Sequence, residues 1–370
     1  MTTWRGQPSM LVRTALPIIA IAAFALTASV IAVAAGSLLG YDFQAYVSAA
    51  HRLLDGERLY DPAVSVAGGF AIYLYPPPYA IAFVPFALIP NGVGVVIWTV
   101  LLGVAFVAGA ALLPVRREVR WAIVLLAALD WPVLYSIKLG QVGPILFLLF
   151  AIGWRAMDRP AWLAGSIVAG TVTKLQPAAL AGWALLTGRV RAAVLAIAGV
   201  LALAAISTLF VGVGAWADYV SLLARVSSPI TTPHNFTPGA IAFQAGASEG
   251  VAAAIQLATT VLAVAASLVA IRYSTAAASF VVVVVATQLV SPLLWDHYAI
   301  ILLIPVAYLI DRGHWWAAAI PLVTSLPLLG LVPPAAYPVE FLVCLLAPIA
   351  VGWSGAPARS PLRLAQGRPG

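Results

Sequence analysis

Long apolar runs separated by short polar stretches dominate this chain. Several runs approach the roughly 20 residues that an α-helix needs to cross a bilayer, and most are bounded by charge, proline or glycine. We therefore expect an all-α polytopic membrane protein, with about 10–12 transmembrane helices. The predicted helices lie near 14–38, 91–113, 119–136, 143–157, 160–175, 177–188, 192–212, 247–271, 274–290, 297–311, 315–331 and 337–354.

Two polar segments between these runs are too long to be turns, namely about 40–90 and 213–246. The apolar stretch from Pro78 to Pro90 inside the first is short and bounded by proline, which favours a helix lying in the membrane interface. Neither segment resembles a separate soluble domain, so we expect one transmembrane domain over 1–354 with external juxtamembrane helices. The remaining 355–370, rich in Gly, Pro and Arg, is predicted to be a disordered cytoplasmic tail.

Composition excludes a water-soluble core, because 63% of the residues are hydrophobic and only 8% are charged. A soluble domain carries about 25% charged residues. The net charge of +7 does not indicate nucleic-acid binding, since the basic residues are dispersed between apolar runs and form no basic helix face. The single cysteine, Cys344, excludes an intrachain disulfide and a cysteine metal site. The first apolar stretch is longer than a signal-peptide core, so we interpret it as an uncleaved transmembrane helix.

The charges predict the orientation. With the amino terminus inside, the lysines and arginines fall on the cytoplasmic side except for Arg52, Arg58, Lys138, Lys174 and Arg225. This bias is the one that the positive-inside rule describes for a protein of the cell (inner or plasma) membrane. Most acidic residues fall on the opposite, periplasmic or extracellular side. We therefore expect a functional site at that external face.

Asp42 stands where the first predicted helix leaves the membrane, with Tyr46 one helical turn further on. A carboxylate there serves either as the cap of an external helix or as a base that deprotonates an acceptor hydroxyl. Arg52 either lies on a solvated helix face or supplies positive charge to the site. The run YLYPPPYAIAFVPFALIP forms either a rigid corner or, with Tyr75, the wall of a groove for a lipid tail or sugar.

The only two lysines are each followed by a polar cluster at an outer helix end, KLGQVGP at 138–144 and KLQP at 174–177. Either lysine alone is explained by snorkelling to the interface. Two such clusters at one face favour phosphate binding by Lys138 or Lys174, with Gln141 and Gln176 bonding sugar hydroxyls.

The third cluster is SPLLWDHY at 291–298, where Trp295, Asp296 and His297 follow one another. Acid–base chemistry, a metal pair and a simple helix cap are all open, although adjacent helical residues do not point the same way and so disfavour a metal pair. His234 in the second external segment is a candidate to join the site from above.

Taken in order, these strings resemble glycosyltransferase family 87, the polyprenyl-phosphate-mannose-dependent group. The resemblance rests on D-F-x-x-Y-x-x-A-A-x-x-L-L-x-G-x-x-L-Y-D-P, Y-P-P, G-Q-V, K-L-Q-P and S-P-x-x-W-D-H, and runs from about Tyr41 to Tyr298. It implies a GT-C fold, a polyprenyl-phosphate sugar donor (mannose most typically), inversion by direct displacement, and Asp42 as the base. The chain departs from the family at Gly143, where Asn is frequent, so the resemblance implies one sugar or loop contact fewer.

Inverting transfer from a phosphate needs one base and positive charge at the leaving group, and it requires no nucleotide-binding loop. We expect no cofactor, and we assign no residues to a metal site. The expected partners are a polyprenyl-phosphate sugar, a glycan or glycolipid acceptor and the bilayer, with no nucleic acid. The competing readings are a transporter or lipid flippase, a transferase using polyprenyl-phosphate arabinose or glucose, and a non-catalytic assembly partner. Transporters place ionisable residues near the midplane, and here only Asp130 and Glu340 fit that pattern.

Overall fold

The computed structural model describes residues 10–61, 72–226 and 234–354 of the chain. Within these ranges the chain is helical, and its only β-type pairing is an isolated bridge between Ser274 and Trp353. Four helices are long and apolar enough to cross a membrane: α1 (Met10–Ala35), α5 (Asn91–Leu112), α11 (Val190–Val211) and α14 (Glu249–Tyr273). The prediction of an all-α, multi-pass membrane protein is confirmed, while the count of about 10–12 crossings stays a prediction.

One further pair of helices is apolar enough to enter the membrane, but it is bent in the middle. The helices α6 (Arg117–Ala127) and α7 (Trp131–Leu139) pass the length and hydropathy test only as a pair, and they meet at an angle of 66°. Pro132, which lacks a backbone N–H, opens α7, and Asp130 before it has an extended backbone. The Trp131 N–H donates instead to the Ser325 hydroxyl, so another helix satisfies the broken turn.

Shorter helices fill the centre of the bundle. Every side chain from Ala278 to Leu289 in α15 (Ala276–Leu289) is buried, as is every residue from His297 to Ile310 in η3 (Asp296–Leu302) and α16 (Leu303–Asp311). The other short helices are α8 (Gly143–Arg155), α9 (Pro160–Thr173), η2 (Gln176–Ala178), α10 (Ala179–Leu186), α13 (Pro238–Gln244), η4 (Trp315–Ala319), α17 (Ile320–Leu328) and α18 (Ala336–Val351).

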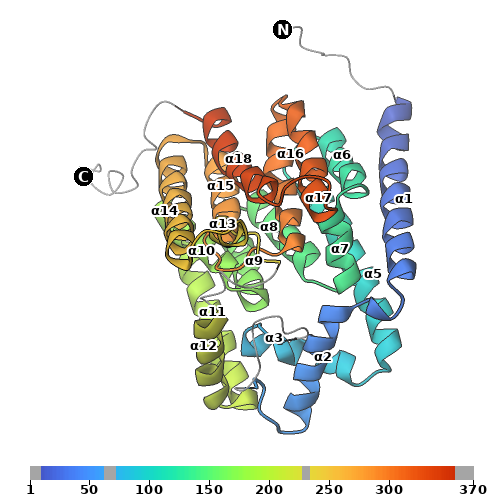
Figure 1. Cartoon of the computed structure of the whole chain (residues 1–370), viewed down its shortest axis with the longest axis vertical. Helices are drawn as coiled ribbons and strands as arrows, with labels where there is room; N and C mark the ends of the chain where they lie inside the picture. The colour runs from blue at the N-terminus through green and yellow to red at the C-terminus, as the bar shows by residue number, and fades with distance from the viewer. Residues whose placement is uncertain (1–9, 62–71, 227–233, 355–370) are drawn as a thin grey trace, which may run out of the picture.

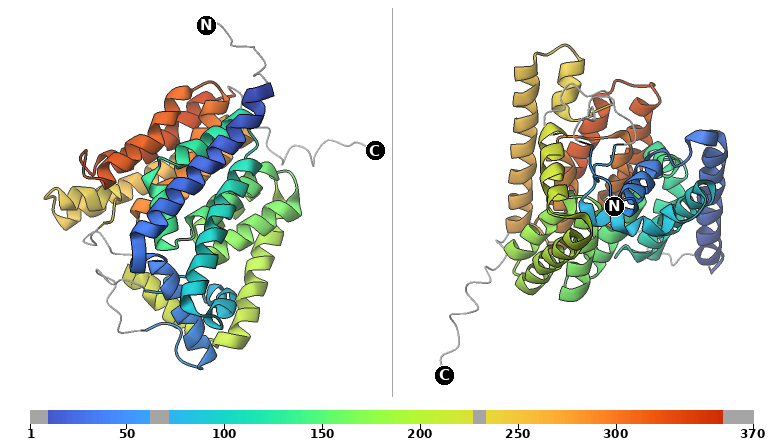
Figure 2. Two further views of the ribbon diagram at one scale, coloured as in Figure 1. Left: turned by 90° about the vertical axis from the view of Figure 1, so that its right-hand side faces the viewer. Right: turned by 90° about the horizontal axis from the view of Figure 1, so that it is seen from below.

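The long helices, by contrast, lie at the periphery. In the most apolar stretch of α1, and likewise of α11, only 11% of the residues are buried. Figures 1 and 2 show α1 and α14 at opposite edges of the molecule. This arrangement is physically consistent, because a helix too short to cross lipid is tolerated where protein surrounds it.

One end of the bundle carries a layer of short helices, formed by α2 (Tyr41–Leu54), α3 (Pro77–Ala82), α4 (Val84–Ala87) and α12 (Gly214–Val226) (lower part of Figure 1). The interfacial helix expected over 78–90 is thus two short helices joined at Phe83. Aromatic rings from α2, α3, α4 and α5 hold this layer to the bundle, with Phe83 4.9 Å from both Tyr46 and Trp98 between ring centroids. We call it the α2 end.

The opposite end gathers a different set of charges. Arg116 pairs with Asp311 at 3.1 Å, and Arg189 pairs with Asp158 at 2.7 Å. At the α2 end, Arg58 pairs with Asp218 of α12 at 2.8 Å. These ion pairs therefore lie at both ends of the bundle, while the sidedness of the two ends stays a prediction.

Candidate active site

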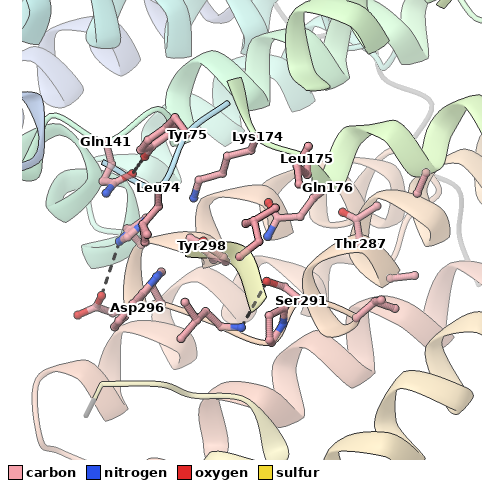
Figure 3. A pocket seen from close by; sticks show the side chains of 18 of the residues that line it. Leu74, Tyr75, Gln141, Lys174, Leu175, Gln176, Thr287, Ser291, Asp296 and Tyr298 are labelled. Atoms are coloured by element: carbon pink, nitrogen blue, oxygen red, sulfur yellow. Dashed lines mark hydrogen bonds and ion pairs between the residues drawn. The ribbon is translucent and has the colours of Figure 1, made fainter. Parts of the chain in front are cut away.

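A single large cavity of about 1360 Å³ opens beneath the α2 end (Figure 3). Its polar part is lined by residues from α2, the α7–α8 junction, the end of α9 and the start of η3. An apolar arm continues from it between α10, α14 and α15. Every site residue predicted from the sequence lines this cavity except Arg52: Asp42, Tyr46, Tyr75, Lys138, Gln141, Lys174, Gln176, His234, Trp295, Asp296 and His297.

Two glycines bring Asp42 to the cavity. Gly40 and Gly140 both have left-handed backbones, with φ of +72° and +74°, which only glycine adopts at little cost. The Gly40 N–H donates to the Lys138 carbonyl at 2.8 Å, and a Cβ on Gly140 would lie 3.2 Å from the Gly40 Cα. Because the chain after η1 (Gly36–Leu38) lies directly against the end of α7, the first turn of α2 faces Gln141.

Asp42 is not the cap of α2. The capping residue is Gly40, and no side chain caps the helix. Instead, the Gln141 amide N–H donates to Asp42 Oδ2 at 2.5 Å. Gln141 Oε1 in turn accepts from the Tyr75 hydroxyl at 3.0 Å, and the Tyr75 and Tyr46 hydroxyls are 2.8 Å apart.

Lys174 and His297 face Asp42 from other elements. Lys174 follows the last residue of α9, and its ammonium lies 3.9 Å from the centroid of the Tyr298 ring. His297 is buried, and neither ring nitrogen has a hydrogen-bond partner within the described residues. Its Nδ1 lies 3.7 Å from Asp296 Oδ1, beyond hydrogen-bond range. Figure 3 shows Gln141, Tyr75 and Lys174 across the cavity from Asp296.

These groups shift one another's proton affinity. Burial raises the pKa of Asp42, and His297, the Gln141 hydrogen bond and Lys174 lower it in part. Burial lowers the pKa of the Lys174 ammonium to about 7, and the Asp42 carboxylate opposes that shift. Opposed shifts of an acid and a base in one cavity are typical of active sites.

Two buried residues hold the turn that carries Asp296 and His297. Asn235 donates to the Pro292 carbonyl and accepts from the Leu294 N–H, both at 3.1 Å. From the other side, the Tyr337 hydroxyl of α18 contacts the Trp295 and Asp296 carbonyls at 2.8 and 2.7 Å and accepts from the Ala299 N–H at 3.1 Å. We call this arrangement the turn clamp.

Arg52 is the predicted site residue that the fold does not bring to the cavity. It lies in the last turn of α2 and donates to the Leu59 carbonyl at 2.8 Å. That bond ties α2 to the following loop, so the guanidinium has a local structural partner.

Position 143 also has a packing explanation. A Cβ on Gly143 would lie 2.7 Å from the Ser136 hydroxyl and 3.0 Å from Ile300, and the residue does not line the cavity. A larger residue here would have to displace the Ser136 and Ile300 side chains, so glycine fits the close approach of α8 to η3.

Sequence reasoning missed three residues that matter to the site. Tyr135 and Tyr298 line the cavity, and Tyr337 supports the Asp296 turn from 40 or so positions further along the chain. The spacing of Tyr135 three residues before Lys138 places both on one face of α7, which is a signal that the sequence contains. Tyr337 has no such local signal.

The fold and the cavity define a multi-pass membrane protein whose polar chemistry is concentrated at one end of the bundle. The model of glycosyltransferase family 87 matches residues 73–293, more than half of the chain. The chain belongs to glycosyltransferase family 87, as its motifs predicted, and it is a membrane glycosyltransferase. Comparisons with curated proteins and with solved structures gave no match. The cavity extends beyond the matched stretch, to Asp42 on one side and to Asp296 and His297 on the other.

Proposed function

We propose that this enzyme transfers a sugar, mannose in the first instance, from a polyprenyl-phosphate donor to an acceptor hydroxyl at the external face, with inversion. The observation that carries the proposal is the shape of the cavity. It joins a polar part holding a carboxylate and an ammonium to a long apolar arm among membrane helices. A donor with a charged sugar phosphate and an isoprenoid tail has that same division.

The apolar arm supports a lipid-linked donor. One face of α14 lines it with Val264, Ser267, Leu268 and Ile271, at the spacing of successive helical turns. Trp183 and Leu186 of α10 and Val283 of α15 complete its wall. Because α14 is a membrane-crossing helix, a tail in this arm stays at bilayer depth while its phosphate reaches Lys174.

The polar part supplies what an inverting displacement needs. Asp42 takes the proton of the acceptor hydroxyl, whose oxygen attacks the anomeric carbon as the bond from that carbon to the phosphate oxygen breaks. The electron pair leaves on polyprenyl phosphate, and Lys174, with Lys138 nearby, stabilises its growing charge. Gln176, His234, Trp295, Asp296 and His297 are placed to contact the sugars.

The sorting of basic residues supports an external site. Arg116 and Arg189, two of the arginines that the sequence assigns to the cytoplasm, lie at the end opposite the cavity, and the positive-inside rule assigns that end to the cytoplasm. The α2 end then faces the periplasm or the extracellular space of the cell membrane.

The proposal is tested by incubating membranes that contain the protein with radiolabelled polyprenyl-phosphate mannose and separating the products. Label moving to a glycan or glycolipid supports it, and Asp42→Asn is expected to abolish transfer without loss of inserted protein. Normal transfer by Asp42→Asn rules out the base assignment.

Parallel incubations with polyprenyl-phosphate arabinose and glucose identify the sugar. Transfer from either, with none from the mannose donor, replaces mannose in the proposal. The transporter alternative has no support from the fold, since Asp130 and Glu340 do not line the cavity.

A further inference from the structure

A one-way chain of hydrogen bonds ends on Asp42. The Tyr75 hydroxyl donates its single hydrogen to Gln141 Oε1, so the hydrogen between Tyr46 and Tyr75 must come from Tyr46. Gln141 then donates from its amide nitrogen to Asp42 Oδ2. The order is therefore Tyr46, Tyr75, Gln141, Asp42, and we call these four side chains the relay.

Chemistry fixes the direction of the relay at its last step. If the Gln141 amide were turned over, its carbonyl oxygen would face the carboxylate at 2.5 Å, which two acceptors tolerate only when a proton lies between them. With the amide as it stands, an ionised Asp42 receives a charge-assisted hydrogen bond. The relay therefore favours the ionised form that a base requires.

The relay is also anchored at Tyr75 and at Gly140, the residue before Gln141. The Tyr60 hydroxyl donates to the Tyr75 carbonyl at 2.7 Å, and the Trp98 indole donates to the Gly140 carbonyl at 2.8 Å. Tyr46, Tyr75 and Gln141 are all buried. Asp42 lines the cavity, and within the described residues its Oδ1 makes no hydrogen bond, so one carboxylate oxygen is held and the other is left unengaged by the protein.

We propose that Tyr46, Tyr75 and Gln141 are positioning residues: the relay holds Oδ2 of Asp42 and leaves Oδ1 to receive the acceptor proton. This inference rests on the proposed role of Asp42 as base. It gives Gln141 a function different from sugar binding, because both ends of its amide are already engaged inside the protein.

Other groups face Asp42 and set the baseline for a pH test. Lys174 beyond α9 and His297 of η3 stabilise its charge, while Asp296 of η3 opposes it. Tyr135 of α7 and Tyr298 also line the same part of the cavity. A change confined to the relay leaves all of these in place.

Gln141→Glu is the most direct test. It preserves shape but puts a second carboxyl group against Asp42, and two carboxyls in contact cannot both ionise readily. We expect the acidic limb of the kcat/KM profile to move to higher pH by about one unit or more. A residue that only supported the fold would not move this limb.

Tyr75→Phe tests the relay one step earlier. Without the tyrosine hydroxyl, the Gln141 amide is free to turn and Asp42 loses its fixed orientation. We expect kcat to fall on the order of 10- to 100-fold, with the donor KM unchanged. Tyr73→Phe is the matched control, since the Tyr73 hydroxyl donates to the Pro76 carbonyl in the same aromatic cluster but takes no part in the relay.

The outcomes separate the two claims. Absence of transfer from every polyprenyl-phosphate sugar by the unaltered protein would overturn the proposed function, whereas full activity of Asp42→Asn would overturn the base assignment and the relay with it. An inactive Asp42→Asn combined with an unmoved acidic limb in Gln141→Glu, or with wild-type kcat in Tyr75→Phe, would overturn the relay alone. A raised KM at constant kcat in Tyr75→Phe would also overturn it, because substrate binding would then be what was lost. If Gln141→Glu does not accumulate in the membrane, Tyr75→Phe decides by itself.

Discussion

Asp42 and Lys174 lie in one cavity, where the pKa of the acid is raised and the pKa of the base is lowered. These two pKa shifts predict a bell-shaped dependence of activity on pH. Asp42, the proposed base, can accept a proton only when ionised, and burial raises its pKa, so we expect activity to be lost at a higher pH than an ordinary carboxylate would give. Lys174, the proposed phosphate contact, carries its charge only when protonated, and its pKa of about 7 predicts loss of activity as the pH rises through that value. The measurement is kcat/KM for the lipid donor against pH, which reports the free enzyme.

Lys174→Arg tests the alkaline limb. A guanidinium stays protonated throughout the accessible range, so we expect the alkaline fall in kcat/KM to disappear even if the maximum is lower. An unchanged alkaline limb in this variant would assign that limb to another group.

Among single residues, the sequence identified side chains that prove to line one cavity, but it did not predict their hydrogen-bond partners. Asp42, Lys174 and His297 stand out because charged or polar residues at the ends of apolar runs are rare. The hydrogen-bond partner of Gln141 could not be predicted from the sequence, because the contact with Asp42 depends on how the turns at Gly40 and Gly140 meet. Arg52 looked equivalent to the other external cations, yet the end of α2 directs it to Leu59.

Among the elements, the contact between the start of α2 and the end of α7 is the one that builds the base into the site. Gly140→Ala introduces both left-handed strain, about 1–2 kcal/mol, and a collision with Gly40 and Phe43. We expect lower thermal stability in detergent and lower kcat. Gly56→Ala is the matched control, because Gly56 has a similar φ of +71° but open space around it. Equal losses in the two variants would mean that the close approach contributes nothing.

The turn clamp predicts a second effect at the level of elements. Tyr337→Phe leaves the Ala299 N–H and two carbonyls of the Asp296 turn without their buried partner, which costs about 1–3 kcal/mol. We expect reduced stability and a reduced kcat. Tyr308→Phe is the control, since the Tyr308 side chain is equally buried and its hydroxyl has no partner within the described residues. If both variants behave as wild type, the clamp does not hold the turn.

Element boundaries show why helix types were easier to predict than crossings. The pattern marks α1, α5, α11 and α14 clearly, because their apolar runs are long enough to cross a bilayer. The run containing α6 and α7 looked continuous, but Pro132 and Ser325 support a 66° bend that hydropathy alone does not reveal. Where protein surrounds a helix, the length of its apolar run no longer shows whether the helix crosses the membrane.

The molecule as a whole places a wide apolar arm beside a narrow polar part, and this predicts selectivity for the lipid. Gly182 lines the cavity, and a side chain there meets nothing within 4 Å, so a larger residue would grow into the arm. We expect Gly182→Trp to raise the KM for a long-chain donor much more than for a donor with a short isoprenoid chain. The measurement is KM for both donors with the same sugar.

Gly103→Trp is the control for this variant. Gly103 also has open space around it, but it lies on α5 and does not line the cavity. A similar rise in KM for both donors in Gly182→Trp, or the same effect in Gly103→Trp, would show that the tail does not occupy the arm.

The cavity could be foreseen in part. The charge pattern predicted that separate polar clusters would meet at one end, and they do. The arm between α10, α14 and α15 was not predicted, because these helices carry ordinary apolar residues whose spacing does not distinguish a groove from a packed interface.

The turn clamp has a consequence for when the enzyme becomes active during synthesis. Asp42 emerges early, whereas Asp296 follows roughly 250 residues later, an interval of about 10–50 s at ordinary ribosomal speeds. Tyr337, which holds the Asp296 turn, is made later still. The helices α14 and α15, which line the apolar arm, are completed only shortly before Asp296, and until the turn is made Asp42 faces neither Asp296 nor His297. The proposed mechanism therefore predicts that a nascent chain cannot consume donor until its last helices have been inserted.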